Sequence, residues 1–316
     1  MIIPILVVLF NVFLLIFPQI VLAASREGLL LWFNNVLPTL LPFMIATNML
    51  ISLGFADFIS QLLSPVMRKV FGLPGTAGFG LVAGLTSGYP MGAKTVADLR
   101  RGGKLSAREA QHLISFCNNA GPLFILGVVG VGMFQNTRVG YVLWAAHICA
   151  ALIVGTLLRK KISNEHTYEK TSFKSALEKY RENRAANVHS IGKVLGDAVK
   201  NSMESMTIIG GLIIFFSVVL AVFETIGLPG NEISHGIFAG FIEVTGGARR
   251  ISALQPTKIT LACAAFVIAF GGFSVHAQSL HFTEGTGIKT SAYLFAKLLH
   301  GIFAAAITVI LCAIFL

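Results

Sequence analysis

The chain has 316 residues, of which 55% are hydrophobic and 12% are charged. A typical soluble domain is about 45–50% apolar and about 25% charged, so this composition excludes an ordinary soluble protein and indicates one with several membrane spans. The formal net charge is +10, but ten of the 24 lysines and arginines lie between residues 159 and 200. We interpret this excess as a topology signal and expect no nucleic-acid partner.

The first apolar run covers residues 2–24 and is long enough for the roughly 20 residues that cross a bilayer. A secretory signal is the alternative, because the run ends in VLAAS. It has no basic residue near its start, and its apolar core exceeds the roughly 7–15 residues of a signal. We therefore predict a retained span, within an N-terminal region of spans and an amphipathic helix over residues 1–71.

The basic segment of residues 159–204 is predicted to be a cytoplasmic loop, because lysine and arginine gather on the cytoplasmic side of membrane proteins. The span Gly140–Leu158 precedes it and the span Met206–Ile226 follows it. The mixed charge of this loop and a helical pattern over Ser172–Tyr180 favour a segment that lies on the membrane surface or is partly disordered. Counting spans from this loop places the basic run Arg100–Lys104 inside as well.

Two further segments are too short to cross the membrane twice. In the first, about ten apolar residues lead to a turn cluster at Thr86–Pro90 and then to an amphipathic stretch that ends in arginines. The second, His235–Pro256, has the same shape with a tip at Glu243–Gly247. We interpret both as helical hairpins that enter the membrane and leave on the same side, as is tolerated where protein surrounds the tip.

Each hairpin is followed by a long apolar helix with a break in its middle. The first break is at Asn118–Pro122 and the second at Gly271 and Gly272. On the charge count, the first hairpin opens to the cytoplasm and the second to the outside. The predicted fold is therefore an all-α polytopic membrane protein with two inverted repeats, each a re-entrant hairpin followed by a discontinuous transmembrane helix, in residues 72–158 and 205–316. This is an architecture of secondary transporters.

The breaks suit a ligand for a physical reason. Where a helix starts anew, its free N–H groups carry a positive partial charge, and where one ends its carbonyls are free. Pro122 loses no donor at the first turn, while Asn118 and Asn119 add polar groups that are costly in lipid unless a partner satisfies them. We therefore expect a small anion at these breaks, and expect leucine at 118 or 119 to remove binding without unfolding.

Four strings carry a resemblance to a known family: GLTSGYPMGAKTVADL, SFCNNAGPLFILG, FIEVTGGARR and FGGFSVHAQS. They resemble the YlbJ family of sporulation integral membrane proteins, within a broader group that has a nucleoside-recognition or "gate" domain and is related in design to concentrative nucleoside transporters. The resemblance extends from about Asn34 to the C-terminus, with a shorter central region than is typical. It implies transport of dipicolinic acid from the mother cell across the outer forespore membrane.

The candidate substrate-binding residues come from the tips and the breaks. They are Ser87, Gly88, Tyr89, Lys94, Asn118, Asn119, Glu243, Thr245, Gly246, Gly247, Ser274, His276 and Gln278. We expect no cofactor and no metal, since the four cysteines are scattered singly and no histidine stands at ligand spacing. A coupling ion and a homo-oligomer remain open. The expected partners are a small anion and the lipid bilayer.

Several of these residues have plainer interpretations. Lys94 and Asp98 are spaced to form an ion pair on one helix, Glu243 could pair with Arg250, and His276 could serve packing. Gly84, Gly127, Gly130 and Gly132 could simply allow close helix packing. Ser106 and Glu109 match a capping box.

Three functional classes remain open at this point. The chain could be a transporter of a small anion, a transporter of a nucleoside-type solute, or a membrane scaffold of sporulation. We do not expect an enzyme, because no nucleophile–base pair or metal cluster is present in the sequence.

Overall fold

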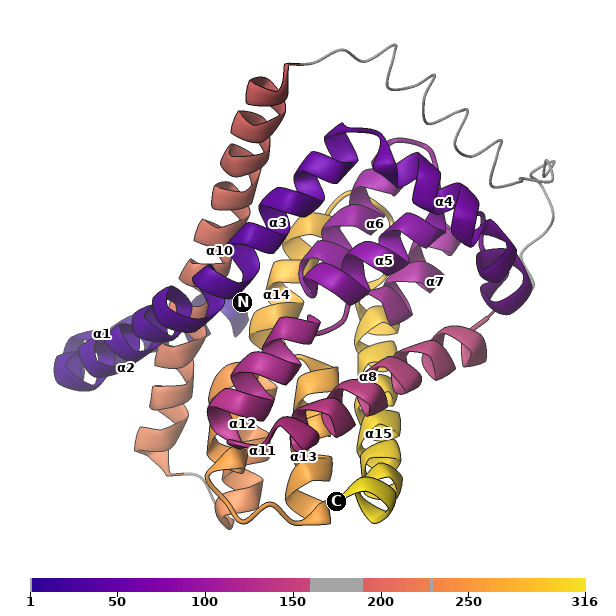
Figure 1. Ribbon diagram of the computed structural model, residues 1–316. Helices are drawn as coiled ribbons and strands as arrows, with labels where there is room; N and C mark the ends of the chain where they lie inside the picture. Colours follow the sequence, from indigo (N-terminus) through magenta and orange to yellow (C-terminus); the bar gives the residue numbers. More distant parts are fainter. Residues whose placement is uncertain (1, 160–189, 228–229) are drawn as a thin grey trace.

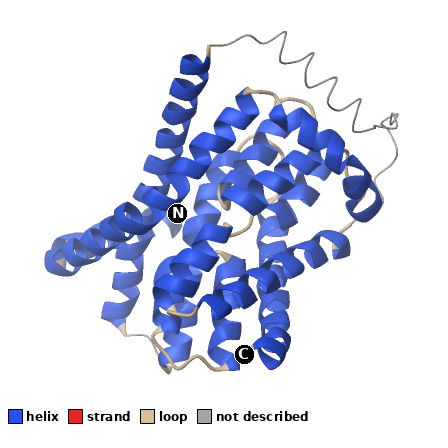
Figure 2. Cartoon of the chain, in the orientation of Figure 1, coloured by secondary structure: helices blue, strands red, loops and turns tan. Residues whose placement is uncertain are grey.

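The computed structural model describes residues 2–159, 190–227 and 230–316, and this part of the chain consists of helices joined by loops and turns, without a strand (Figure 2). Five helices in it are long and apolar enough to cross a membrane. They cover the segments Pro18–Ser52, Thr137–Leu157, Ile191–Ile226, Lys258–Thr283 and Thr290–Phe315. The prediction of an all-α protein with several membrane spans is thus confirmed.

The N-terminal region differs from the predicted single span over residues 2–24. The helix is broken at Phe17, because Pro18 lacks an N–H and stands at the first turn of a new helix. After this break the chain stays helical from Pro18 to Ser52, with a short π-helical segment in the middle. The elements are α1 (Ile2–Ile16), α2 (Pro18–Leu31), η1 (Trp32–Val36), α3 (Leu37–Ser52), α4 (Phe55–Val66) and η2 (Met67–Phe71).

The first hairpin and the interrupted helix after it have their turn and their break at the predicted positions. The turn at residues 88–90 separates the two hairpin helices, and residues 118–121 interrupt the next helix. The predicted capping box is present, since the Ser106 hydroxyl accepts from the Glu109 N–H and the Glu109 carboxylate accepts from the Ser106 N–H at 2.7 Å. The elements are α5 (Ala77–Ser87), α6 (Met91–Arg101), α7 (Ala107–Cys117), η3 (Leu123–Met133) and α8 (Thr137–Leu157).

The second half repeats this order. Its first helix begins at Ile191, well before the predicted start of the span at Met206, so the basic loop is shorter than predicted at this end. The helical pattern predicted for Ser172–Tyr180 lies outside the described residues. The elements are α10 (Ile191–Ile226), α11 (Glu232–Ile242), α12 (Val244–Ser252), α13 (Lys258–Phe270), α14 (Gly272–Thr283) and α15 (Thr290–Phe315).

The two hairpins lie in opposite halves of the molecule. In Figure 1, α5, α6 and α7 lie in the upper half, while α11, α12 and α13 lie in the lower half. Helix α14 returns to the upper half, where it packs against α6, and α15 packs against α13, α8 and α7. The turn of the first hairpin lies close to the second break, since a Cβ atom at Gly271 would be 3.9 Å from the ring of Tyr89.

Glycines allow the close packing within each hairpin. A Cβ atom at Gly84 of α5 would overlap the carbonyl oxygen of Cys117 and touch Gly92 of α6. A Cβ atom at Gly247 of α12 would likewise overlap the backbone of Gly240 in α11. The packing interpretation of Gly84 is thus confirmed.

Candidate functional site

The tip of the first hairpin rests directly on the first helix break. The Tyr89 N–H donates to the carbonyl oxygen of Asn119. Gly88 has a φ of 78°, and a Cβ atom there would collide with the backbone of Gly121. This left-handed conformation and close approach explain why glycine stands at the tip.

The tip of the second hairpin is closed by Glu243. This side chain is the N-cap of α12, and its two carboxylate oxygens accept from the N–H of Thr245 at 3.1 Å and of Gly246 at 2.6 Å. The break between α13 and α14 lies against this tip, since a Cβ atom at Gly272 would come within 2.6 Å of the Gly240 carbonyl oxygen. The same Cβ atom would lie 3.2 Å from the nitrogen of Val244 at the tip, so each hairpin tip contacts the break that follows it in the chain.

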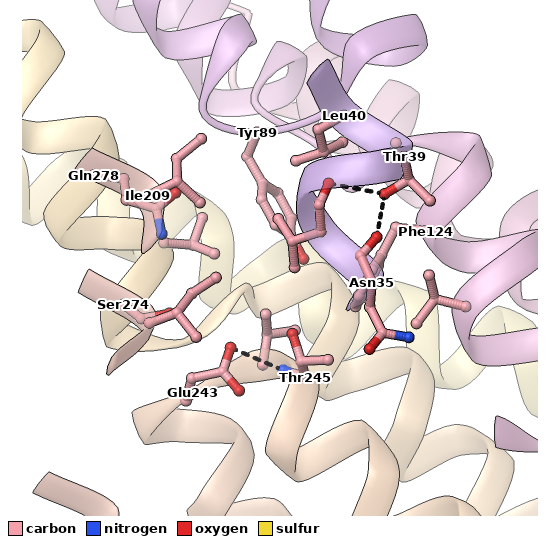
Figure 3. A pocket seen from close by; sticks show the side chains of 16 residues that line it. Asn35, Thr39, Leu40, Tyr89, Phe124, Ile209, Glu243, Thr245, Ser274 and Gln278 are labelled. Carbon is pink, nitrogen blue, oxygen red and sulfur yellow. Dashed lines mark hydrogen bonds between the residues drawn. The ribbon is translucent and has the colours of Figure 1, made fainter. Parts of the chain in front are cut away.

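A cavity lies where the two tips and the two breaks come together. Its volume is about 40 Å³, room for roughly three waters at about 10–15 Å³ each. Figure 3 shows Glu243, Thr245, Ser274 and Gln278 facing Tyr89, Thr39 and Asn35 across it. The lining residues are Asn35, Val36, Thr39, Leu40, Tyr89, Gly121, Phe124, Val128, Ile209, Ile213, Glu243, Val244, Thr245, Ser274, Val275 and Gln278.

The cavity gathers five of the thirteen predicted site residues. They come from both repeats: Tyr89, Glu243, Thr245, Ser274 and Gln278. Two of them present buried hydroxyl groups without a hydrogen-bond partner in the described residues, Ser274 Oγ and Tyr89 Oη. The site therefore retains hydrogen-bonding capacity that a bound molecule or water can use.

Other lining residues were not predicted. Asn35 and Thr39 lie at η1 and the start of α3, where the sequence places them within a long apolar run. Polar residues in such a run, next to Pro38, were the available signal, and π-helical segments are frequent at functional sites. Ile209 and Ile213 of α10 carry no signal, because apolar residues are expected all along a span.

Asn118 lies outside the cavity, and its side chain forms hydrogen bonds that hold helices together. Its side-chain NH₂ donates to Ser279 Oγ and to Tyr293 Oη, each at 2.8 Å, and its oxygen accepts from the Ala93 N–H at 3.2 Å. Asn118 thereby joins the first repeat to α14 and α15. Its neighbour Asn119 donates to the Phe116 carbonyl oxygen at 2.8 Å, and Asn119 Oδ1 has no partner among the described residues.

The remaining predicted residues lie around the cavity rather than in its lining. The Ser87 hydroxyl bonds to Thr47 at 2.8 Å, and His276 Nδ1 lies 3.3 Å from Tyr293 Oη. Gly246 and Gly247 belong to the first turns of α12, and Gly88 packs on the first break. Lys94 lies on α6, one turn from Asp98, and its positive charge acts electrostatically on that carboxylate. The ion pair of Asp98 is formed with Arg101, at 3.7 Å.

The alternative pairing of Glu243 with Arg250 is wrong. Glu243 caps its own helix, whereas Arg250 pairs with Glu224 of α10 and Arg249 with Glu27 of α2. The two arginines therefore link the end of α12 to neighbouring helices. Among the described residues, Glu243 accepts from the N–H groups at the start of α12 rather than from either arginine.

A second buried polar cluster was missed entirely. Lys297 and His300 of α15 and His147 of α8 are each at most 1% exposed. Lys297 Nζ lies 2.9 Å from the Asn118 carbonyl oxygen and 3.0 Å from His300 Nδ1. The signal was available, because lysine and histidine three residues apart in an apolar span are costly and mark functional positions.

Comparison with known proteins identifies the family. A family model described as nucleoside recognition, the Gate domain, matches residues 33–137. The chain is also 36% identical over 318 aligned residues to the sporulation integral membrane protein YlbJ of Bacillus subtilis (strain 168), covering 93% of this chain and 78% of that protein. The chain belongs to the YlbJ family of sporulation integral membrane proteins.

The family assignment confirms the resemblance drawn from the hairpin and break motifs. The Gate match covers the polar residues of η1, the first hairpin and the first broken helix, so it includes one half of the cavity lining. No solved structure matches the chain. Within the described residues, no group of three or more His, Cys, Asp or Glu side chains is arranged to hold a metal ion.

Proposed function

We propose that this YlbJ-family protein transports a small anionic solute, dipicolinic acid, from the mother cell into the forespore across the outer forespore membrane. The observation that supports this proposal is the cavity, which both hairpin tips and both helix breaks line. Secondary transporters bind their substrates at such places, near the middle of the membrane.

The repeated order of elements supports a transport role. In each half, a glycine of the first hairpin arm packs on a glycine of the second, Gly84 on Gly92 and Gly240 on Gly247. The hairpins lie in opposite halves of the molecule (Figure 1). We interpret this as a pair of inverted repeats, whose relative motion would expose the cavity to one side of the membrane and then to the other.

The chemistry of the lining suits a carboxylate at the second break. Helix α14 starts at Gly272 without a side-chain cap, and Ser274, which is 1% exposed, has an unpartnered hydroxyl in its first turn. Free N–H groups and a hydroxyl at a helix N-terminus form a favourable anion site. The N–H groups at the start of α12 do not offer such an anion site, because those of Thr245 and Gly246 already donate to the Glu243 carboxylate.

The size of the cavity bears on the transport cycle. A volume of about 40 Å³ holds a few waters but not a pyridine ring with two carboxylates. Transport of such a solute therefore requires the cavity to widen. Apolar side chains of α10 on one wall, Ile209 and Ile213, can move apart without breaking hydrogen bonds.

A nucleoside-type solute is the second candidate, and one observation favours it. Among the residues that the structure describes, those that line the cavity include the acid Glu243 but no lysine or arginine. Neutral hydroxyl and amide groups, with Tyr89 and Phe124 available for stacking, suit an uncharged polar ring. The match to a nucleoside-recognition family model agrees with this alternative.

Binding to the purified protein separates the two candidates. We expect dipicolinate to bind and uridine not to compete, and Gln278→Leu to weaken binding about tenfold, corresponding to about 1.4 kcal/mol. Asn11→Leu, on the exposed face of α1, is the matched control and should bind normally. If uridine binds and dipicolinate does not, a nucleoside-type solute replaces the anion as the proposed substrate. If neither binds, the result favours a membrane scaffold.

A further inference from the structure

The buried cluster of Lys297, His300 and His147 lies beside the cavity on the other side of the first helix break. Lys297 contacts the carbonyl oxygen of Asn118, and the next carbonyl, of Asn119, accepts from Tyr89 at the cavity wall. The N–H of Ala120 donates to His147 Nε2 at 3.0 Å. Three consecutive residues of the break therefore link this cluster to the cavity.

The hydrogen bonds fix the tautomers of both histidines. His300 Nε2 lies 2.9 Å from the His147 carbonyl oxygen, which accepts only, so this nitrogen carries the hydrogen and Nδ1 accepts from Lys297. His147 Nε2 accepts from the Ala120 N–H, so its hydrogen is on Nδ1, which has no partner in the described part of the chain. Both rings are neutral in this arrangement.

Lys297 has two acceptors in this structure, the Asn118 carbonyl oxygen and His300 Nδ1. A neutral amine has two N–H bonds, and these two acceptors satisfy both; an ammonium group has a third, for which the described residues provide no acceptor. None of the ion pairs among the described residues includes Lys297. A buried lysine without an acidic partner changes its protonation state readily.

The other titratable groups around Lys297 do not supply a negative charge. They come from α7, α8, α14 and α15, and as thiol, phenol or imidazole groups they are neutral in their ordinary forms. These groups are Cys117 of α7, His147 of α8, His276 of α14, and Tyr293 and His300 of α15. Glu243 is the one acid in the cavity lining among the described residues, and its carboxylate already accepts from the N–H groups of Thr245 and Gly246. An anion that enters the cavity would add a negative charge that can balance a positive charge on Lys297.

We propose that Lys297 is the proton-binding site that couples solute movement to a proton, so that the protein is a proton–anion symporter; this rests on the proposed function. A proton from the aqueous side binds the lone pair of Nζ and forms an ammonium group when the anion occupies the cavity. Its charge offsets one carboxylate across the break. After the cavity opens to the other side, the anion leaves, the N–H bond of the ammonium breaks, and the proton returns to water.

Proteoliposomes that contain a pH-sensitive dye and receive dipicolinate from outside provide the test. For the wild type, we expect a pH gradient, acid outside, to raise uptake about tenfold, and dipicolinate addition to acidify the lumen. Lys297→Arg keeps a fixed charge, because the guanidinium does not deprotonate, so its uptake should no longer respond to the gradient. Lys289→Met, at an exposed lysine before α15, should behave as the wild type.

The outcomes separate the two claims. If the wild type takes up dipicolinate equally with and without the gradient and the dye does not respond, proton coupling is wrong while the transport function stands. If no dipicolinate enters under either condition, the transport function fails and the coupling fails with it. Should Lys297→Arg not fold, Lys297→Met, which cannot bind a proton, takes its place in the same assay. A Lys297 variant whose uptake still rises with the gradient and still acidifies the lumen would show that Lys297 is not the proton-binding site.

Discussion

Asn118 and Asn119 stand side by side in the sequence but have different environments in the fold. Asn118 is fully satisfied and holds α6, α14 and α15 together, whereas Asn119 has an unpartnered side-chain oxygen. The sequence indicated that both amides needed partners, because polar groups in a membrane are costly. It could not indicate that two of the three partners of Asn118, Ser279 and Tyr293, come from residues more than 150 positions later.

The first prediction follows from this difference. Asn118→Ala removes three hydrogen bonds and leaves the Ala93 N–H buried without a partner, so we expect a loss of about 3 kcal/mol in stability. Asn119→Ala removes one side-chain bond and should cost about 1 kcal/mol. Thermal unfolding in detergent, followed by intrinsic fluorescence, compares the two. Equal melting temperatures for both variants would contradict the structural role of Asn118. They would instead agree with the sequence-based expectation that a substitution at 118 removes binding without unfolding the protein.

Lys297 and His300 could be predicted only in part from the sequence. Both lie in the apolar run that we interpreted simply as a final span. Their spacing of three residues places them on one face of a helix, and this pattern was readable. Their shared contact with the first break was not, since it depends on how α15 packs against α7 and α8.

At the scale of elements, the positions of glycine and proline predicted most of the turns and helix breaks. The turn at residues 88–90 and the breaks at residues 118–121 and at Gly271 lie where the sequence placed them. The break at Phe17–Pro18 was missed although Pro18 is plain in the sequence, because the length of the apolar run outweighed it. The bounds of α10 were missed because its first turns are polar and look like a loop.

The second prediction concerns the packing of the first hairpin. A Cβ atom at Gly84 would overlap the Cys117 carbonyl oxygen, which belongs to the backbone and cannot rotate away. Gly84→Ala should therefore destabilise the protein by about 3 kcal/mol or prevent its accumulation. Gly127→Ala is the matched control, because that position faces open space. Membrane expression and melting temperature measure both, and a normal Gly84→Ala protein would contradict the described hairpin packing.

At the scale of the whole molecule, charge and hydropathy were enough to predict a helical membrane protein with short hairpins between its spans. The cavity could not be predicted in full, because its lining comes from six separate regions of the chain. The hairpin tips and breaks supplied Tyr89, Glu243 and Ser274 from the sequence. The opposite wall, from η1, α3 and α10, depends on tertiary packing and appears only in the fold.

Solute uptake is the measurement that tests the central claim most directly, namely that the cavity between the two repeats is the path of a small anion. Radiolabelled dipicolinate should enter proteoliposomes that contain the wild-type protein about tenfold faster than it enters empty liposomes. Ser274→Leu, which fills the cavity at the second break, should abolish this uptake. Phe273→Leu, at its exposed neighbour, should not. Equal uptake by wild-type and Ser274→Leu proteoliposomes, or none by either, would contradict the account.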